Sequence, residues 1–150
     1  FYGDCLALVL VGDLPPSDFV GRLRAILPVY PLGKVENVEM LRTAYNAADL
    51  FLITSVIDNL PNVLLESLAC GTPVAGFKVG GIPEVVKPGW TGVLSDLGDT
   101  TDLAEQISAL LKDPGKLEQM RLNCRERAVR SYSLELQATR YQALYNLLLA

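Results

Sequence analysis

Two acidic residues flank a proline and a short apolar run near the middle of the chain. Asp58 precedes Pro61, and Glu66 follows it, within the segment "DNLPNVLLESLACGTP". Carboxylates accept hydrogen bonds from hydroxyl groups, and the free N–H groups at a helix N-terminus attract anions. This segment therefore either binds a ligand with hydroxyl and anionic groups or forms only a loop, a helix and a strand that pack together.

The apolar run predicts a helix over Pro61–Cys70. Proline suits the first position of a helix, and Gly71 suits the position just past its end. Glu66 then lies about 7.5 Å along the helix axis, at ~1.5 Å per residue, on the face that carries Asn62. The leucines Leu64, Leu65 and Leu68 share a different face, which we expect to meet a sheet. The N–H groups expected to be free, at the positive end of the helix dipole, are those of Asn62, Val63 and Leu64.

The order of these groups matches the order of groups in a nucleotide sugar. A loop carboxylate, a cluster of amides and a second carboxylate would meet hydroxyls, a diphosphate and a ribose. Further along, Gly80 and Gly81 would let the backbone approach a ligand closely, and Lys78 would add positive charge. Each feature also has a simpler interpretation: a solvated helix glutamate, an aspartate bonded to its own turn, and glycines that close a tight turn. The residues alone leave both interpretations open.

The elements that must position these residues alternate along the chain. Apolar runs predict strands at 5–12, 29–33, 49–54, 73–77 and 91–95. Helices are predicted at 18–27, 38–48 and 61–70, from Ile82, and at 101–112, 114–130 and 133–149. Ser17 and Asn37 are the expected caps of the first two helices. The first run, 5–12, is continuously apolar up to Gly12, which is typical of a strand buried on both faces, and we expect the run at 49–54 to be another such strand.

This alternation predicts an α/β fold with a doubly wound, Rossmann-like, mostly parallel sheet, helices on both faces and a helical C-terminal end. In such a sheet, ligands bind at the carboxyl edge, where each strand leads into its helix. Three loops are expected at that edge: 12–17, 55–60 and 78–81. The last two loops follow successive strands of the chain, so we expect them to face each other.

Composition narrows the function classes. The chain has 150 residues, of which 50% are hydrophobic, so one compact domain is expected. Its net charge of −4 has the wrong sign for a nucleic-acid binder, and it contains no histidine, which removes Ser-His and Cys-His nucleophiles. Cys5, Cys70 and Cys124 are expected to be reduced, buried thiols of a cytoplasmic protein. Because the chain opens on Phe1 and its first strand follows at once, we interpret it as a fragment.

Several spaced motifs resemble the retaining glycosyltransferases of family 4, also called group 1. The pattern is carried by "DNLPNVLLESLACGTPVAGFKVGGIPE", by the preceding "YPLGKVENVEMLRTAYNAADLFLITS", and by "TGVL". The resemblance covers nearly the whole chain, with the motifs in the same order. It implies that residues 1–150 are the C-terminal, nucleotide-sugar-binding domain of a GT-B fold, with the N-terminal acceptor domain missing before Phe1.

The resemblance also implies roles for individual residues. Glu66 would hold the ribose hydroxyls of the donor, and Asp58 would meet the sugar hydroxyls, so both are candidate catalytic residues. The backbone that would contact the sugar and diphosphate is that of Asn59, Leu60, Pro61, Asn62, Val63 and Leu64. The loop that would lie against the base is formed by Leu32, Gly33, Lys34 and Val35. Asp58 stands where glutamate is usual, and Asn59-Leu60 replaces the common Gly-Phe, so the sugar pocket departs from the family pattern.

The activity that the resemblance implies is hexosyl transfer with retention of configuration. The expected donor is a UDP-sugar such as UDP-glucose, the expected acceptor is a glycan or a lipid-linked molecule, and neither a metal nor a cofactor is expected. The isolated domain is expected to bind donor but not to transfer sugar. An apolar stripe on the last helix suggests self-association, and the full-length protein is expected in the cytoplasm or at the inner face of the membrane.

Three alternatives remain. A sugar-nucleotide epimerase shares the fold, and a non-catalytic nucleotide-binding domain would explain the altered loop. A dehydrogenase is the weakest alternative, because Gly12 is followed by Asp13 and Leu14 rather than by G-x-G-x-x-G.

Overall fold

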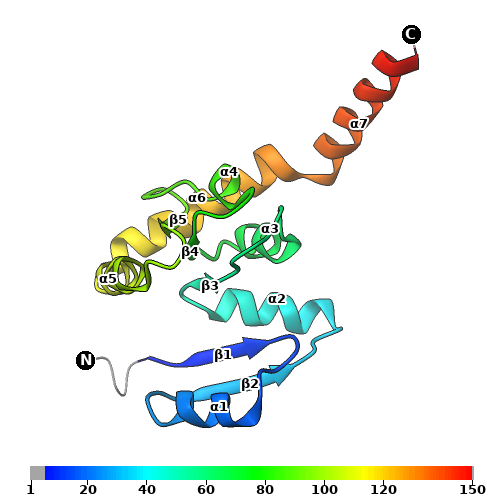
Figure 1. Cartoon of the computed structure of the whole chain (residues 1–150). Helices are drawn as coiled ribbons and strands as arrows, with labels where there is room; N and C mark the ends of the chain where they lie inside the picture. The colour runs from blue at the N-terminus through cyan, green and yellow to red at the C-terminus, as the bar shows by residue number, and fades with distance from the viewer. Residues whose placement is uncertain (1–5, 150) are drawn as a thin grey trace. The chain divides into compact units, whose positions relative to one another are not determined.

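The computed structural model describes residues 6–149, which divide into two compact units after Ala44 (Figure 1). The first unit holds β1 (Leu8–Val11), α1 (Ser17–Arg24), β2 (Val29–Gly33) and most of α2 (Val38–Ala47). The last turn of α2, from Tyr45, belongs to the second unit. The second unit continues with β3 (Phe51–Ile53), α3 (Asn62–Ala69), β4 (Val74–Phe77), α4 (Ile82–Val85), β5 (Gly92–Ser95), α5 (Thr100–Leu111), α6 (Pro114–Tyr132) and α7 (Leu134–Leu149).

All paired strands are parallel, which confirms the predicted α/β class. In the first unit β1 pairs with β2, so that Leu8 lies opposite Val29 and Val11 opposite Gly33. In the second unit the strand order is β3-β4-β5. We expected one sheet, whereas the hydrogen bonds of the described strands form a two-stranded sheet in one unit and a three-stranded sheet in the other.

Helices cover both faces of the three-stranded sheet. Successive strand residues point to opposite faces, so Val74 and Leu94 join one apolar cluster while Ala75 and Val93 join another. The first cluster is completed by α3, α4 and α6, with Ile53, Leu64, Leu68, Ile82, Val85, Val86, Cys124 and Ala128. The second cluster is completed by α5 and α6, with Phe77, Leu103, Leu110, Leu117 and Met120. The core of this unit therefore fixes α3 against the sheet.

The prediction that the first and third strands are buried on both faces is wrong. Val9 and Val11 of β1 are exposed by 47% and 44%, and Leu52 of β3 is exposed by 44%. Each of these strands has only one strand partner and alternates its burial, whereas every residue of β4 and β5 is buried. A continuous apolar run thus indicated the strand but not the number of faces that other elements cover.

The cysteines and the helix caps follow the predictions in part. Cys124 is fully buried, and this burial raises the pKa of its thiol to about 12. Cys70 is half-buried, and Cys5 lies outside the described residues. The side chain of Asn37 accepts a hydrogen bond from the Met40 N–H at 3.0 Å, which confirms the predicted cap of α2. Ser17 is instead the first residue of α1, because Pro16 occupies the cap position.

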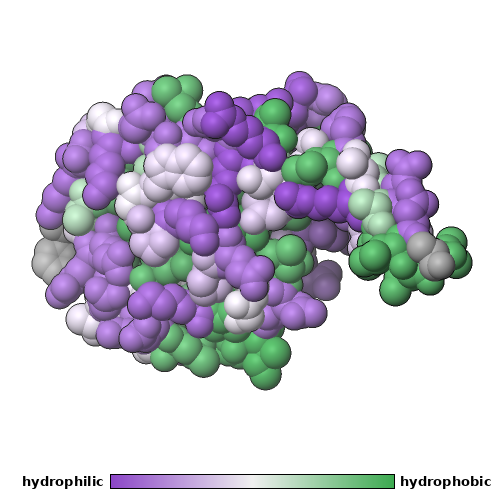
Figure 2. All heavy atoms as spheres, turned by 90° about the horizontal axis from the view of Figure 1, so that it is seen from above, coloured by the Kyte–Doolittle hydropathy of each residue, from purple (hydrophilic) through white to green (hydrophobic). Residues whose placement is uncertain are grey.

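The last helix carries exposed apolar side chains. No residue of α7 is buried, and Figure 2 shows hydrophobic residues gathered where the end of this helix lies. The apolar stripe from which we expected self-association is exposed, with Tyr141, Leu144, Tyr145 and Leu148 each accessible by 47% or more. Among residues 6–149, no helix combines the length and the apolar character needed to cross a membrane.

Candidate functional site

The helix that carries Glu66 begins one residue later than expected. Pro61 has φ −70° and ψ 132°, so it lies in the extended region immediately before the first helical residue, Asn62. A proline in this position has no side-chain acceptor, and α3 has no side-chain cap at its start. At the other end, Gly71 adopts φ +74° just past Cys70, as predicted for a helix-ending glycine. The start of α3 is therefore left open to an outside hydrogen-bond acceptor.

Two of the three backbone N–H groups that we expected to be free remain candidates for binding an anion. The N–H of Leu64 donates to the carbonyl of Pro61 at 3.1 Å, so it is already paired within the first turn. The N–H groups of Asn62 and Val63 precede it and have no carbonyl acceptor inside the helix. Leu64 and Leu68 are fully buried, so the opposite side of α3 faces solvent. The helix dipole and these amides give that end of α3 a positive potential.

Glu66 lies on the exposed side of α3 and is tied to a tyrosine. The hydroxyl of Tyr45 donates to Oε2 of Glu66 at 3.3 Å and, at the same distance, to the carbonyl of Val63. Burial of the Tyr45 ring, together with the negative charge of Glu66, raises the pKa of the tyrosine hydroxyl. The sequence analysis did not single out this residue. The available signal was the spacing of Tyr45, four residues after the apolar Leu41 on the same face of α2.

Asp58 lies in the loop before α3 and is half-buried. The hydroxyl of Ser55 donates to Oδ2 of Asp58 at 3.3 Å, so the local partner of this aspartate is a side chain and not the backbone N–H typical of an aspartate in a turn. One carboxylate oxygen has the capacity for further hydrogen bonds, so this contact is compatible with a ligand role as well.

The paired glycines hold this loop in place. The N–H of Gly81 donates to the carbonyl of Asn59 at 2.6 Å. A Cβ atom on Gly80 would lie 1.7 Å from the carbonyl oxygen of Asp58, and one on Gly81 would lie 2.5 Å from that of Asn59. The loops at 55–60 and 78–81 therefore face each other as predicted, but the close approach that the two glycines allow is to the neighbouring backbone.

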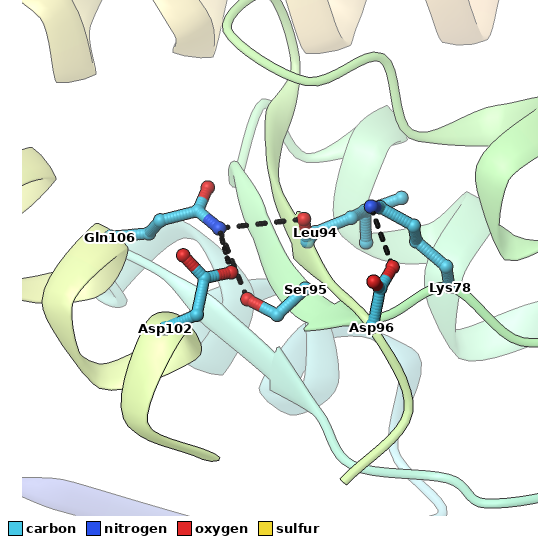
Figure 3. A network of polar contacts seen from close by, with 6 residues as sticks. All are labelled: Lys78, Leu94, Ser95, Asp96, Asp102 and Gln106. Atoms are coloured by element: carbon cyan, nitrogen blue, oxygen red, sulfur yellow. Dashed lines mark hydrogen bonds and ion pairs between the residues drawn. The ribbon is translucent and has the colours of Figure 1, made fainter. Parts of the chain in front are cut away.

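Lys78 has an acidic partner. Its Nζ lies 2.8 Å from Oδ1 of Asp96, and Figure 3 shows the two side chains pointing toward each other beyond the ends of β4 and β5. The hydrogen bond to Asp96 raises the pKa of Lys78. In the same network Gln106 donates to Asp102 at 2.7 Å and to the hydroxyl of Ser95 at 3.0 Å. The positive charge that we expected Lys78 to add is thus compensated within the chain.

The residues predicted to lie against a base belong to the first unit. Leu32 and Gly33 end β2, and Gly33 turns the chain with φ +68°. Lys34 and Val35 follow, and Nζ of Lys34 lies 3.3 Å from Oε1 of Glu36. In the described part of the chain, no three His, Cys, Asp or Glu residues are grouped so that they could hold a metal ion.

Comparisons with known proteins show the family to which the chain belongs. The family model for glycosyl transferases of group 1 matches residues 4–113. The N-acetyl-alpha-D-glucosaminyl L-malate synthase of Bacillus anthracis is 39% identical over 142 residues, which are 92% of this chain and 36% of the relative. The chain thus spans little more than a third of that relative's length.

Solved structures show the same likeness. Sucrose-phosphate synthase from Thermosynechococcus elongatus superposes with a TM-score of 0.82 and 32% identity, over 95% of this chain and 38% of that one. Anabaena Alr3699/HepE in complex with UDP-glucose superposes with a TM-score of 0.75 and 26% identity, over 92% of this chain and 40% of that one. This chain belongs to the group 1 glycosyltransferases of the GT-B fold.

Proposed function

We propose that this chain is the donor-binding domain of a retaining hexosyltransferase and that it binds a UDP-sugar such as UDP-glucose. The observation that carries the proposal is that the loop at 58–60 leads directly into the uncapped start of α3, which carries Glu66 on its exposed side. The hydrogen bond from Gly81 to Asn59 fixes this loop against the segment at 78–81. The relative solved with UDP-glucose supports the choice of donor.

Each part of the site has a chemical task in this proposal. Glu66 accepts hydrogen bonds from the ribose hydroxyls, and the amides of Asn62 and Val63 bind the diphosphate. Leu32, Gly33, Lys34 and Val35 lie against the base, and Asp58, with the backbone of Asn59 and Leu60, meets the sugar. The negative charge that develops on the departing diphosphate is then stabilised by amides and a helix dipole that are already oriented, which requires no metal ion.

The proposal assigns acceptor binding to another part of the protein. Because the chain spans 36% of its Bacillus relative and 38% of the synthase structure, we propose that it works with an N-terminal domain that binds a glycan or lipid-linked acceptor. Alone, the chain would bind donor without transferring sugar. Association through the exposed face of α7 and a position at the inner face of the membrane belong to the same proposal.

Calorimetric titration with UDP-, GDP- and ADP-glucose tests the donor site. We expect one nucleotide class to bind and Glu66→Gln to weaken it by about tenfold or more, since a hydrogen bond to a charged group contributes about 1.5–3 kcal/mol. Glu118→Gln changes another exposed glutamate, on α6, and should leave donor affinity unchanged. Equal binding by Glu66→Gln and wild type would refute the assignment of the ribose to Glu66. Product analysis with a two-domain protein separates transfer from epimerisation, which would return a free epimerised nucleotide sugar.

A further inference from the structure

We propose that Tyr45 is a positioning residue that orients the Glu66 carboxylate toward the ribose of the donor, an inference that rests on the proposed function. The two residues lie 21 positions apart, on different helices, and meet through the tyrosine hydroxyl and Oε2 of Glu66.

The tyrosine is held firmly enough to act as a fixed donor. Its ring is buried, with 8% of the residue exposed, and it contacts the ring of Phe51 edge-on at a centroid distance of 5.6 Å. Its backbone carbonyl accepts a hydrogen bond from the hydroxyl of Thr72 at 2.7 Å. Thr72 is fully buried and Phe51 packs against the apolar core of the same unit, so the hydroxyl of Tyr45 has a defined position.

The glutamate has no such restraint of its own. A glutamate on the exposed side of a helix samples several rotamers, and fixing one of them costs conformational entropy. The tyrosine hydroxyl lies between the carbonyl of Val63 and Oε2 of Glu66, which are three residues apart in sequence and on one side of α3. A hydrogen bond to Oε2 selects the rotamers that keep the carboxylate near this point and leaves Oε1 available to a ligand.

The hydroxyl stays a donor at neutral pH. Burial and the charge of Glu66 both raise its pKa above the ordinary value of 10.0, which is already far above neutral pH. A phenylalanine would fill the same space and keep the contact with Phe51. The hydroxyl itself is therefore the group that the test must remove.

A double-mutant cycle separates positioning from a purely structural role. Tyr45→Phe should weaken UDP binding by about 2- to 10-fold, less than Glu66→Gln does, because it frees the carboxylate to rotate without removing it. In a Glu66→Gln background the same change should have little effect, because the carboxylate is no longer there to orient. The same cycle can be repeated with 2′-deoxy-UDP and 3′-deoxy-UDP. The loss of affinity caused by Tyr45→Phe should be smaller for the nucleotide that lacks the hydroxyl bound by Glu66 than for the other one.

Tyr132→Phe is the matched control. It removes a hydroxyl that accepts a hydrogen bond from Arg127 at 3.5 Å, in the same unit, and it should leave UDP affinity unchanged. Thermal melting of each variant reports whether it folds. The inference is overturned if folded Tyr45→Phe binds UDP like wild type, or if its loss is the same with and without Glu66. If Glu66→Gln itself leaves UDP binding unchanged, the ribose site of the proposed function has failed, which is a different result.

Discussion

Replacing Gly80 with alanine should displace the loop that carries Asp58. Gly80 has φ +49°, a left-handed conformation that costs an alanine about 1–2 kcal/mol. The new Cβ would also lie 1.7 Å from the carbonyl oxygen of Asp58, where real Cβ contacts stay beyond 3.0 Å. Because that oxygen belongs to the backbone, the loop would have to retreat by roughly 1 Å or more, and overpacking of this kind costs about a further 1–3 kcal/mol.

Gly89→Ala provides the control for the conformational cost alone. Gly89 has φ +77°, but the Cβ of an alanine there would meet no atom of the described residues within 4 Å. At about 2–4 °C per kcal/mol for a chain of this size, Gly89→Ala should lower the melting temperature by about 2–8 °C. Gly80→Ala should lower it further by a similar amount.

The binding assay distinguishes a displaced site from a merely weakened fold. Calorimetry at a temperature where both variants are folded should give Gly80→Ala an affinity for UDP-glucose at least about tenfold below wild type, because the backbone of Asn59 and Leu60 leaves its place. Gly89→Ala should bind like wild type. Equal affinities of the two variants would refute the claim that the glycine contact positions the donor loop.

Three further predictions concern charge and burial. Because the pKa of Cys124 rises from an ordinary 9.0 to about 12, the folded state holds the thiol proton more tightly than the unfolded state does. The free energy of unfolding of the protein should therefore fall as pH rises from 9 to 12. Cys124→Ala should flatten this dependence on pH in urea titrations. Arg127→Ala should lower the free energy of unfolding by about 2–4 kcal/mol, because the guanidinium of Arg127 donates to two carbonyls at the end of α4. Arg130→Ala is the surface control and should change the free energy of unfolding by less than about 0.5 kcal/mol. Lys78→Gln should leave UDP affinity unchanged in calorimetry, because Asp96 already compensates the charge of the lysine. A loss of UDP affinity in Lys78→Gln that Asp96→Asn does not show would contradict this.

Local signals in the sequence predicted the elements well. The bounds of β2 agree with the run that ends at Gly33, and the cap by Asn37 and the helix end at Gly71 both occur where expected. These features depend on residues within a few positions of each other, such as a capping side chain or a glycine with positive φ. The start of α3 also depends on a local signal, but its predicted position was wrong by one residue, because proline fits the cap position as well as the first turn.

Features that depend on distant residues escaped prediction. The hydroxyl of Tyr45 meets Glu66 across 21 positions, and Lys78 meets Asp96 across 18. Neither pair has a spacing that any local pattern would select, because the sheet brings the residues together. The two glycines were recognised as points of close approach, but their partner, the backbone at Asp58 and Asn59, appears only in the folded unit.

An NMR titration with UDP tests whether the start of α3 and Glu66 form the donor site. We expect the largest shifts of backbone amide signals at Asn59, Leu60, Asn62 and Val63 and near Glu66, and we expect these shifts to shrink in Glu66→Gln. Large shifts confined to α5 and α6, with residues 59–66 unchanged, would contradict it.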